Sequence, residues 1–321
     1  MHFWYQRTTW WAWGFYPLSL LFRVISLSRF WLYKFNLLKS AKSVLPVIVV
    51  GNISVGGNGK TPFAIWLCEL LIKQGYRPGI ISRGYGGKSK HYPLLVDDQT
   101  IGKEAGDEPI MLFKRLGIPV VVDPVRSEAA KYLSDNNLAD IIITDDGLQH
   151  YALQRDIEIV VVDGKRRFGN QHLMPMGPLR EPLSRLENVD FIINNGEQKD
   201  GEFTMLLAPD DCLSVDGENR LLPTNKPINA CAAIGYPQRF FDTLKKQQFI
   251  LNKTVSFADH HPFSAKDFEQ FNPHTPLLMT EKDAVKCTGF AQDNWWYLPI
   301  SAQLPSVFEK QLIEKIKEIT C

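Results

Sequence analysis

The sequence predicts an α/β fold in which helices cover both faces of a parallel sheet, with a second, smaller α/β unit after it. Two observations carry this prediction. Apolar runs rich in β-branched residues recur without polar alternation, and segments with helical spacing separate them. This pattern is typical of parallel strands that are buried on both faces. The 321 residues are enough for two ordinary domains.

The expected elements alternate regularly after the first 45 residues. Strands are predicted at 47–52, 77–84, 118–123, 139–147, 157–164 and 189–194, and helices at 61–76, 107–117 and 126–137. Short antiparallel strands are expected at 203–209 and 212–217, and the second unit ends with a helix at 305–320. We therefore divide the chain into an N-terminal segment (1–42), a nucleotide-binding domain (43–210) and a second α/β domain that closes over the nucleotide (211–321).

The N-terminal segment is basic and aromatic. No Asp or Glu precedes Glu69, and five of the eight tryptophans lie before residue 32. Trp and Tyr favour the bilayer interface, and basic residues favour anionic headgroups. The charge-free run from Thr8 to Phe22 is shorter than a bilayer span, which takes about 20 residues. We expect a helix from Phe15 to Leu38 that lies in or on a membrane; the alternative is a helix packed on its own domain.

The stretch SVGGNGKT resembles a phosphate-binding loop, whose rule is G-x-x-x-x-G-K-[ST]. A predicted strand precedes it and a predicted helix follows. The loop's backbone N–H groups and the helix N terminus would face phosphate oxygens. Lys60 would reach the terminal phosphates and the Thr61 hydroxyl would hold Mg²⁺. The expected nucleotide-binding residues are Ser54, Val55, Gly56, Gly57, Asn58, Gly59, Lys60 and Thr61. Only Ser54, in place of the first Gly, departs from the general rule.

An acidic pair follows the predicted strand at 139–147. Asp145 and Asp146 lie where a neighbouring strand would supply carboxylates to the Mg²⁺ beside the loop. Two adjacent carboxylates at a strand end are costly unless a cation or hydrogen bonds offset them. The alternative is a simple D-D-G turn. His150 follows in the same loop, and spacing alone does not say whether it faces the site.

Three further polar clusters stand at predicted strand or helix ends, where open α/β sheets bind ligands. Arg83 and Tyr85 lie in SRGYGG, Asp107 and Glu108 begin a helix in GDEP, and Arg180 lies in PMGPLREP. From spacing alone, Asp107 is equally a helix cap. The triplet in ADHHPF offers metal ligands, an acid–base pair or a cap, and zinc is disfavoured because no further cluster at metal spacing accompanies it.

Net charge and cysteine usage exclude other classes. The formal net charge is +1, so the whole molecule is not built to bind nucleic acid. The five cysteines are scattered without a C-x-x-C pair, which argues against a zinc site or a disulfide framework and suggests a reducing compartment.

Seven motifs together resemble the tetraacyldisaccharide 4′-kinase family of lipid A synthesis. They are VGNISVGGNGKTP, ISRGYGG, GDEP, TDDGLQH, PMGPLREP, ADHHPF and TEKDAVK, in the family's order. The family's loop also carries Ser at the position of Ser54. The resemblance implies a P-loop kinase core, ATP and Mg²⁺ as cofactors, and transfer of the γ-phosphate to the 4′-hydroxyl of a tetraacylated glucosamine disaccharide 1-phosphate. It further implies a lipid substrate, a membrane surface and no nucleic acid as partners, a monomer, and a peripheral or monotopic location on the cytoplasmic face of the bacterial inner membrane.

The resemblance also assigns roles to individual residues. Asp107 maps onto the catalytic aspartate, and its partner histidine onto His260 rather than His261. Asp145 and Asp146 map onto the metal-binding pair. The residues implied for the acceptor and phosphate region are Arg83, Tyr85, Glu108, His150 and Arg180, and those on the nucleotide-facing side of the second domain are Glu281, Lys282 and Asp283.

The alternative function is a membrane-associated P-loop ATPase or GTPase switch. Such a protein would use the same loop and acidic pair. A GTPase would also need an N-K-x-D motif to recognise guanine, and TEKDAVK lacks that spacing.

Overall fold

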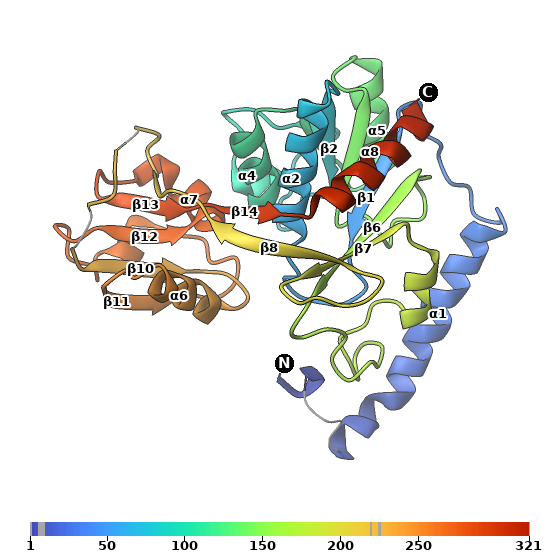
Figure 1. Ribbon diagram of the computed structural model, residues 1–321, viewed down its shortest axis with the longest axis horizontal. Helices are drawn as coiled ribbons and strands as arrows, with labels where there is room; N and C mark the ends of the chain where they lie inside the picture. Colours follow the sequence, from blue (N-terminus) through green and yellow to red (C-terminus); the bar gives the residue numbers. More distant parts are fainter. Residues whose placement is uncertain (1, 6–9, 219, 224–225, 321) are drawn as a thin grey trace.

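A computed structural model describes residues 2–5, 10–218, 220–223 and 226–320 of the chain. They form two α/β units of different size, and a long helix lies along one side of the larger unit (Figure 1). Each unit is built on one sheet.

The larger unit contains a nine-stranded sheet in the order β14-β8-β7-β6-β1-β5-β2-β4-β3. Its strands are β1 Val47–Gly51, β2 Pro78–Ser82, β3 Leu94–Leu95, β4 Val120–Val122, β5 Ile141–Asp145, β6 Ile157–Asp163, β7 Phe191–Asn195, β8 Phe203–Pro209 and β14 Ile300–Gln303. All neighbours are parallel except the edge pairs β3–β4 and β8–β14. The β-branched runs of β1 and β5 are buried along their whole length, as expected for central strands.

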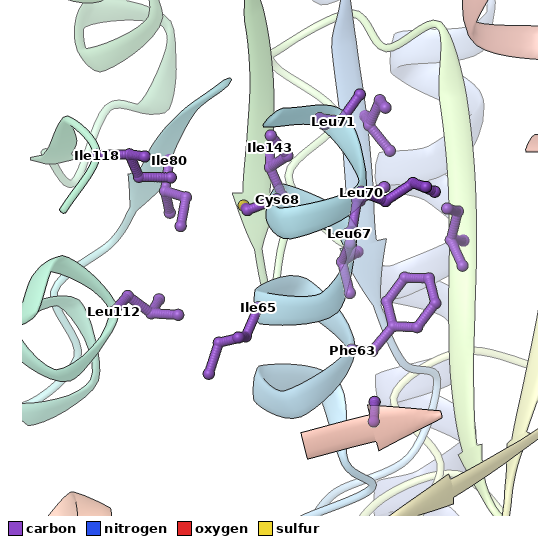
Figure 2. Close-up of a cluster of buried hydrophobic side chains, with 14 of the residues drawn as sticks. Phe63, Ile65, Leu67, Cys68, Leu70, Leu71, Ile80, Leu112, Ile118 and Ile143 are labelled. Atoms are coloured by element: carbon purple, nitrogen blue, oxygen red, sulfur yellow. The ribbon is translucent and has the colours of Figure 1, made fainter. Parts of the chain in front are cut away.

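Helices cover both faces of this sheet. They are α2 Lys60–Lys73, α3 Gly102–Ala105, α4 Asp107–Leu116, α5 Arg126–Asp135, α8 Ser306–Thr320 and the 3₁₀ helix η3 Leu183–Asn188. Apolar side chains of α2 fill the space between the sheet and α4, with Ile65 directed toward Leu112 (Figure 2). Phe63 on the same helix is fully buried and lies 6.1 Å, centroid to centroid, from the ring of Phe308 on α8.

The smaller unit contains a five-stranded sheet in the order β11-β10-β12-β13-β9. Its elements are β9 Leu213–Ser214, β10 Ile228–Ala232, α6 Pro237–Lys246, β11 Leu251–Ser256, η4 Ala265–Phe268, β12 Leu277–Thr280, α7 Glu281–Cys287, η5 Thr288–Phe290 and β13 Trp295–Leu298. Only β9 runs antiparallel to its neighbour.

The strand at 203–209 corrects one sequence prediction. It does not form a separate antiparallel element: its first half pairs in parallel with β7, and its second half pairs antiparallel with β14. The chain thus leaves the larger unit on β8 and returns on β14 (Figure 1). The predicted second domain, 211–321, therefore differs from the observed topology, because β14 and α8 belong to the larger sheet. The helical spacing of residues 305–320 predicted the final helix, but no local signal in the sequence shows which sheet that helix covers.

The N-terminal segment begins with the 3₁₀ helices η1 His2–Tyr5 and η2 Trp10–Phe15, followed by α1 Tyr16–Lys34. The Ser19 hydroxyl anchors α1, since it donates to the Leu173 carbonyl at 3.0 Å and accepts from the Met176 amide at 2.9 Å. Within the described parts of the chain, no helix combines the length and apolar character needed to cross a bilayer.

Candidate active site

The phosphate-binding loop connects β1 to α2, as the sequence predicted. Gly56 and Gly59 have φ angles of +114° and +93°, which L residues rarely adopt. Ser54 does not need such a conformation. It is buried, and its hydroxyl accepts a hydrogen bond from the Asn58 side chain at 3.0 Å. The serine thus braces the loop internally, which explains why the missing first glycine is tolerated.

The acidic pair lies beside this loop because β5 is the neighbour of β1, with Asp145 opposite Val50. Lys60 Nζ lies 3.4 Å from one carboxylate oxygen of Asp146, and Arg180 Nη1 lies 3.0 Å from the other. The loop lysine, the acidic pair and the 173–180 loop therefore meet at one point.

Burial is the main reason why the pKa of Asp145 rises to about 7, and the Glu108 carboxylate adds to this effect. Burial also acts on Asp146, but Lys60 and Arg180 outweigh it and lower the pKa of that carboxyl. Glu108 stands in the first turn of α4, so the start of this helix contributes to the electrostatics of the acidic pair.

The first residue of α4, Asp107, lies where the two units meet. Its Oδ2 atom is 3.6 Å from Nδ1 of His260 and 3.7 Å from Nζ of Lys286, both in the smaller unit. His261 turns away, with Nε2 3.2 Å from Asp267 and its ring stacked on Phe257. Of the two histidines that the sequence left open, His260 is the one near Asp107.

Lys282 lies in the same cluster. Its Nζ is 3.3 Å from His260 Nε2 and 3.6 Å from Glu108 Oε1. Tyr85, which is largely exposed, places its ring 5.7 Å from that of His260. Residues from both units thus surround Asp107.

Comparison with known proteins agrees with this arrangement. The model of the family described as LpxK, tetraacyldisaccharide-1-P 4′-kinase, matches residues 11–317. The chain belongs to this family. The resemblance seen in the motifs is therefore confirmed.

Two curated relatives and one solved structure illustrate how far the similarity extends. The tetraacyldisaccharide 4′-kinase of Psychromonas ingrahamii is 66% identical over 321 residues, the whole of both chains. That of Tolumonas auensis is 50% identical over 317 residues, which cover 98% of this chain and 97% of the relative. The crystal structure of the "apo" form of LpxK from Aquifex aeolicus in complex with ATP has a TM-score of 0.84 and 31% identity, and the match covers 97% of this chain and 99% of that one. The predicted α/β kinase fold is therefore shared with that enzyme.

The acidic pair, Asp145 and Asp146, fits a magnesium ion. Oδ1 of Asp145 is buried and has no hydrogen-bond partner among the described residues, which suits an oxygen that coordinates a cation. In the described residues, no three His, Cys, Asp or Glu side chains converge on one point. Mg²⁺ needs no such cage, because it is commonly held by one or two carboxylates, substrate phosphates and waters.

Two residues that the resemblance places on the nucleotide-facing side of the second domain make contacts within the protein. Glu281 pairs with Arg115, 3.5 Å away, at the junction of the two units. Asp283 is fully buried, and its carboxylate accepts from the Ala233 amide and the Thr280 hydroxyl. The structure corrects the expectation for Asp283, because its buried carboxylate is already bonded within the smaller unit on both oxygens, the second of them to Lys286 Nζ at 3.0 Å. The N-cap of α7 is Thr280, whose hydroxyl accepts from the Asp283 amide at 3.2 Å, so the motif TEKDAVK marks the start of this helix.

Sequence reasoning also missed residues that shape the site. Arg126 is buried at the start of α5 and donates to the carbonyls of Asp145 and Asp146 at 3.0 and 2.9 Å. Glu181 is buried next to Arg180 and accepts hydrogen bonds from Gln149 and Tyr151. Arg126 belongs to none of the seven motifs, and Glu181, although it lies in PMGPLREP, was not singled out there; burial distinguishes both from surface charges.

His150 is held neutral at physiological pH. Burial and then the positive charges of Arg126, Arg155, Arg29 and Arg83 lower its pKa to about 4. Its imidazole can therefore exchange hydrogen bonds with a ligand near neutrality but does not supply a positive charge there.

This shift predicts a pH dependence of stability. An unfolded histidine binds a proton below about pH 6.5, whereas folded His150 does not until about pH 4. The free energy of unfolding therefore falls as the pH drops from 6.5 toward 4. Between pH 7 and pH 5, the free energy of unfolding of His150→Gln should fall by about 1 kcal/mol less than that of wild type. This figure allows for solvent screening at the partly exposed ring. Urea unfolding at both pH values measures this, with the exposed His274→Gln as control; parallel losses in wild type and His150→Gln would contradict it.

Proposed function

We propose that this chain is an ATP-dependent kinase that transfers the γ-phosphate of ATP to the 4′-hydroxyl of a tetraacylated glucosamine disaccharide 1-phosphate, which yields lipid IVA in lipid A synthesis. The observation that carries the proposal is that one unit holds a phosphate-binding loop beside a carboxylate pair, with Lys60 3.4 Å from Asp146, and also Asp107, which lies 3.6 Å from His260. Family membership and the ATP complex of the Aquifex aeolicus relative support it.

ATP would bind with its phosphates in the loop at 54–61. Lys60, now 3.4 Å from Asp146, would turn to the β- and γ-phosphate oxygens and offset the charge that develops during transfer. Thr61, Asp145 and Asp146 would hold Mg²⁺, which when bound supplies further neutralisation of the phosphates. Arg180 would keep the Asp146 carboxylate in place, since it is already its ion-pair partner.

Asp107 would accept the proton of the 4′-hydroxyl, or orient that hydroxyl for attack. His260 and Lys286 face the same carboxylate oxygen. Because both partners come from the smaller unit, the base is complete only while the two units are together, which would also exclude water from the reaction.

The acceptor's 1-phosphate is an anion, and the structure offers a basic region near His150. Arg29 of α1, Arg83, Arg126 and Arg155 all contribute positive potential there. Arg83 is exposed and forms no ion pair in the described residues, so it is free to bind an anion. We assign the acceptor's polar head to this region, together with Tyr85 and Glu108.

The N-terminal segment would bring the site to the membrane surface, as a peripheral or monotopic protein on the cytoplasmic face of the inner membrane. Large apolar side chains are exposed along α1 and its C-terminal end: Leu18, Leu21, Val24, Ile25, Trp31 and Phe35. An apolar groove lies among Val24, Leu27, Trp31 and Phe35. Exposed apolar surface flanked by Arg and Lys is typical of an interfacial helix. Acyl chains could then remain in lipid while the sugar enters the site.

A charge on the apolar face of α1 tests this placement. We expect the double substitution Leu21→Asp and Ile25→Asp to lower partitioning onto anionic vesicles about ten-fold or more. It removes apolar area that would enter the membrane and adds negative charge that anionic lipids repel. Vesicle sedimentation measures it. Leu221→Asp, at a still more exposed leucine far along the chain, should bind like wild type. If the double variant also binds like wild type, α1 is not the membrane contact.

The function itself is tested with Mg-ATP and a detergent-dispersed tetraacylated glucosamine disaccharide 1-phosphate. A product with a second phosphate at the 4′ position, identified by mass spectrometry and NMR, is expected. ATP hydrolysis without that product would instead indicate a P-loop ATPase switch.

A further inference from the structure

An arginine outside the motifs, Arg166, contacts the phosphate-binding loop. Arg166 stands in the turn after β6, and Asp163 at the end of that strand fixes it. The buried Asp163 carboxylate accepts from the Arg166 amide at 2.8 Å and from its Nε at 3.1 Å. Arg239 of the smaller unit lies 3.6 Å from the same carboxylate. The guanidinium is therefore held in one orientation.

Its free edge faces the loop. Nη2 donates to the Gly57 carbonyl, and to the Asn58 side-chain oxygen at 3.3 Å. A Cβ atom at Gly56 would lie 2.9 Å from Nη1, so only glycine fits there without displacing the guanidinium. In a trans peptide the N–H points opposite to the C=O. Holding the Gly57 carbonyl toward Arg166 therefore directs the Asn58 N–H away from it, to the side where phosphate oxygens would lie.

The N-terminal segment reaches the same place. The Tyr5 ring lies 5.5 Å from the Arg166 guanidinium carbon, and its hydroxyl donates to the Val55 carbonyl at 3.2 Å. Trp4 next to it donates from its indole nitrogen to the Pro175 carbonyl at 2.9 Å, and its own carbonyl accepts from the Asn170 amide at 2.8 Å. Tyr5 is thus fixed against both the loop and the arginine.

We infer that Arg166 is a positioning residue for the phosphate-binding loop, and that Tyr5 of the N-terminal segment holds it in place. The segment proposed to meet the membrane would thereby contribute to ATP affinity as well. The inference rests on the proposed kinase function, and it concerns residues that neither the loop motif nor the acidic pair includes.

Steady-state kinetics with both substrates varied test this role. Arg166→Ala should raise KM for ATP about ten-fold, because it removes the charge-assisted hydrogen bonds that hold the loop. KM for the lipid and kcat should stay within about two-fold of wild type, because Arg166 orients the loop and does not touch the reacting atoms. Arg166→Lys should recover part of the affinity. Lys165→Ala removes an exposed positive charge from the same turn and should leave all constants unchanged. A fall in kcat with KM for ATP unchanged would overturn the inference.

A double-mutant cycle tests the link to Tyr5. Tyr5→Ala should raise KM for ATP about five-fold, and Tyr5→Phe less, because the phenyl ring still packs on the guanidinium. Adding Tyr5→Ala to Arg166→Ala should cause little further change, since the two residues act as one unit. Fully additive effects would show that Tyr5 acts independently.

Binding of a fluorescent ATP analogue without lipid completes the test. A wild-type protein that binds no ATP contradicts the kinase proposal, whereas normal ATP binding by all variants contradicts only this inference.

Discussion

Replacing Asp107 with asparagine is expected to lower kcat by about 10²–10⁴-fold, the range that general-base groups contribute. Asparagine has nearly the same size, but it cannot accept the proton of the acceptor hydroxyl. The dissociation constant for ATP should change less than about two-fold, because the phosphate-binding loop is untouched. Product formation at saturating lipid, together with nucleotide binding by calorimetry, measures both effects.

The neighbouring Asp98 provides the control for this substitution. It is an exposed aspartate, and Asp98→Asn should behave like wild type. Thermal unfolding separates catalysis from folding, since Asp107 is also the first residue of α4. If Asp107→Asn lowers ATP affinity and kcat to the same extent and destabilises the fold, Asp107 is a helix-end residue and not the base.

Lys60→Met is the second substitution for which we expect a large effect. Methionine keeps most of the side-chain volume but removes the ammonium group that would bind the phosphates. We expect kcat/KM for ATP to fall about 10²–10³-fold, as when a single preorganised donor to a transition state is removed. Asp146 retains Arg180 as an ion-pair partner at 3.0 Å, so the acidic turn should remain folded.

Lys73→Met is the matched control, because Lys73 lies exposed at the other end of the same helix. It should leave the kinetic constants unchanged. A Lys60→Met enzyme with wild-type kcat/KM would mean that the loop does not bind the transferred phosphate. The same outcome would also remove the basis for the proposed role of Asp107, because no phosphate donor would be bound at this site.

The sequence predicted those parts of the site that depend on local chemistry. The loop at 54–61 and the pair Asp145 and Asp146 stand out because a turn, a charge and a strand end coincide there. The strands of the larger sheet were predicted for the same reason, since buried parallel strands leave long apolar runs. Family resemblance singled out Asp107 and His260, and the structure places their side chains near each other.

Features that depend on distant parts of the chain could not be predicted. Arg126 and Arg166 look like ordinary charges until the fold brings one against the acidic turn and the other against the loop. Asp283 shares a motif with partly exposed residues, and only its complete burial reveals a structural role. The strand at 251–256 has a polar outer face and lies at a sheet edge, so it lacks the apolar run that marked the others.

The return of the chain on β14 has a consequence for synthesis. Residues 306–320 supply Phe308 and Leu312, which complete the core around Phe63. While the protein is being made, that apolar face of α2 lacks its cover until almost the whole polypeptide has left the ribosome. The smaller unit, whose sheet uses residues 213–298, can fold before then. The nucleotide-binding half, though it begins first, is therefore the last to be finished, and a chain cut short near residue 300 would expose its largest core.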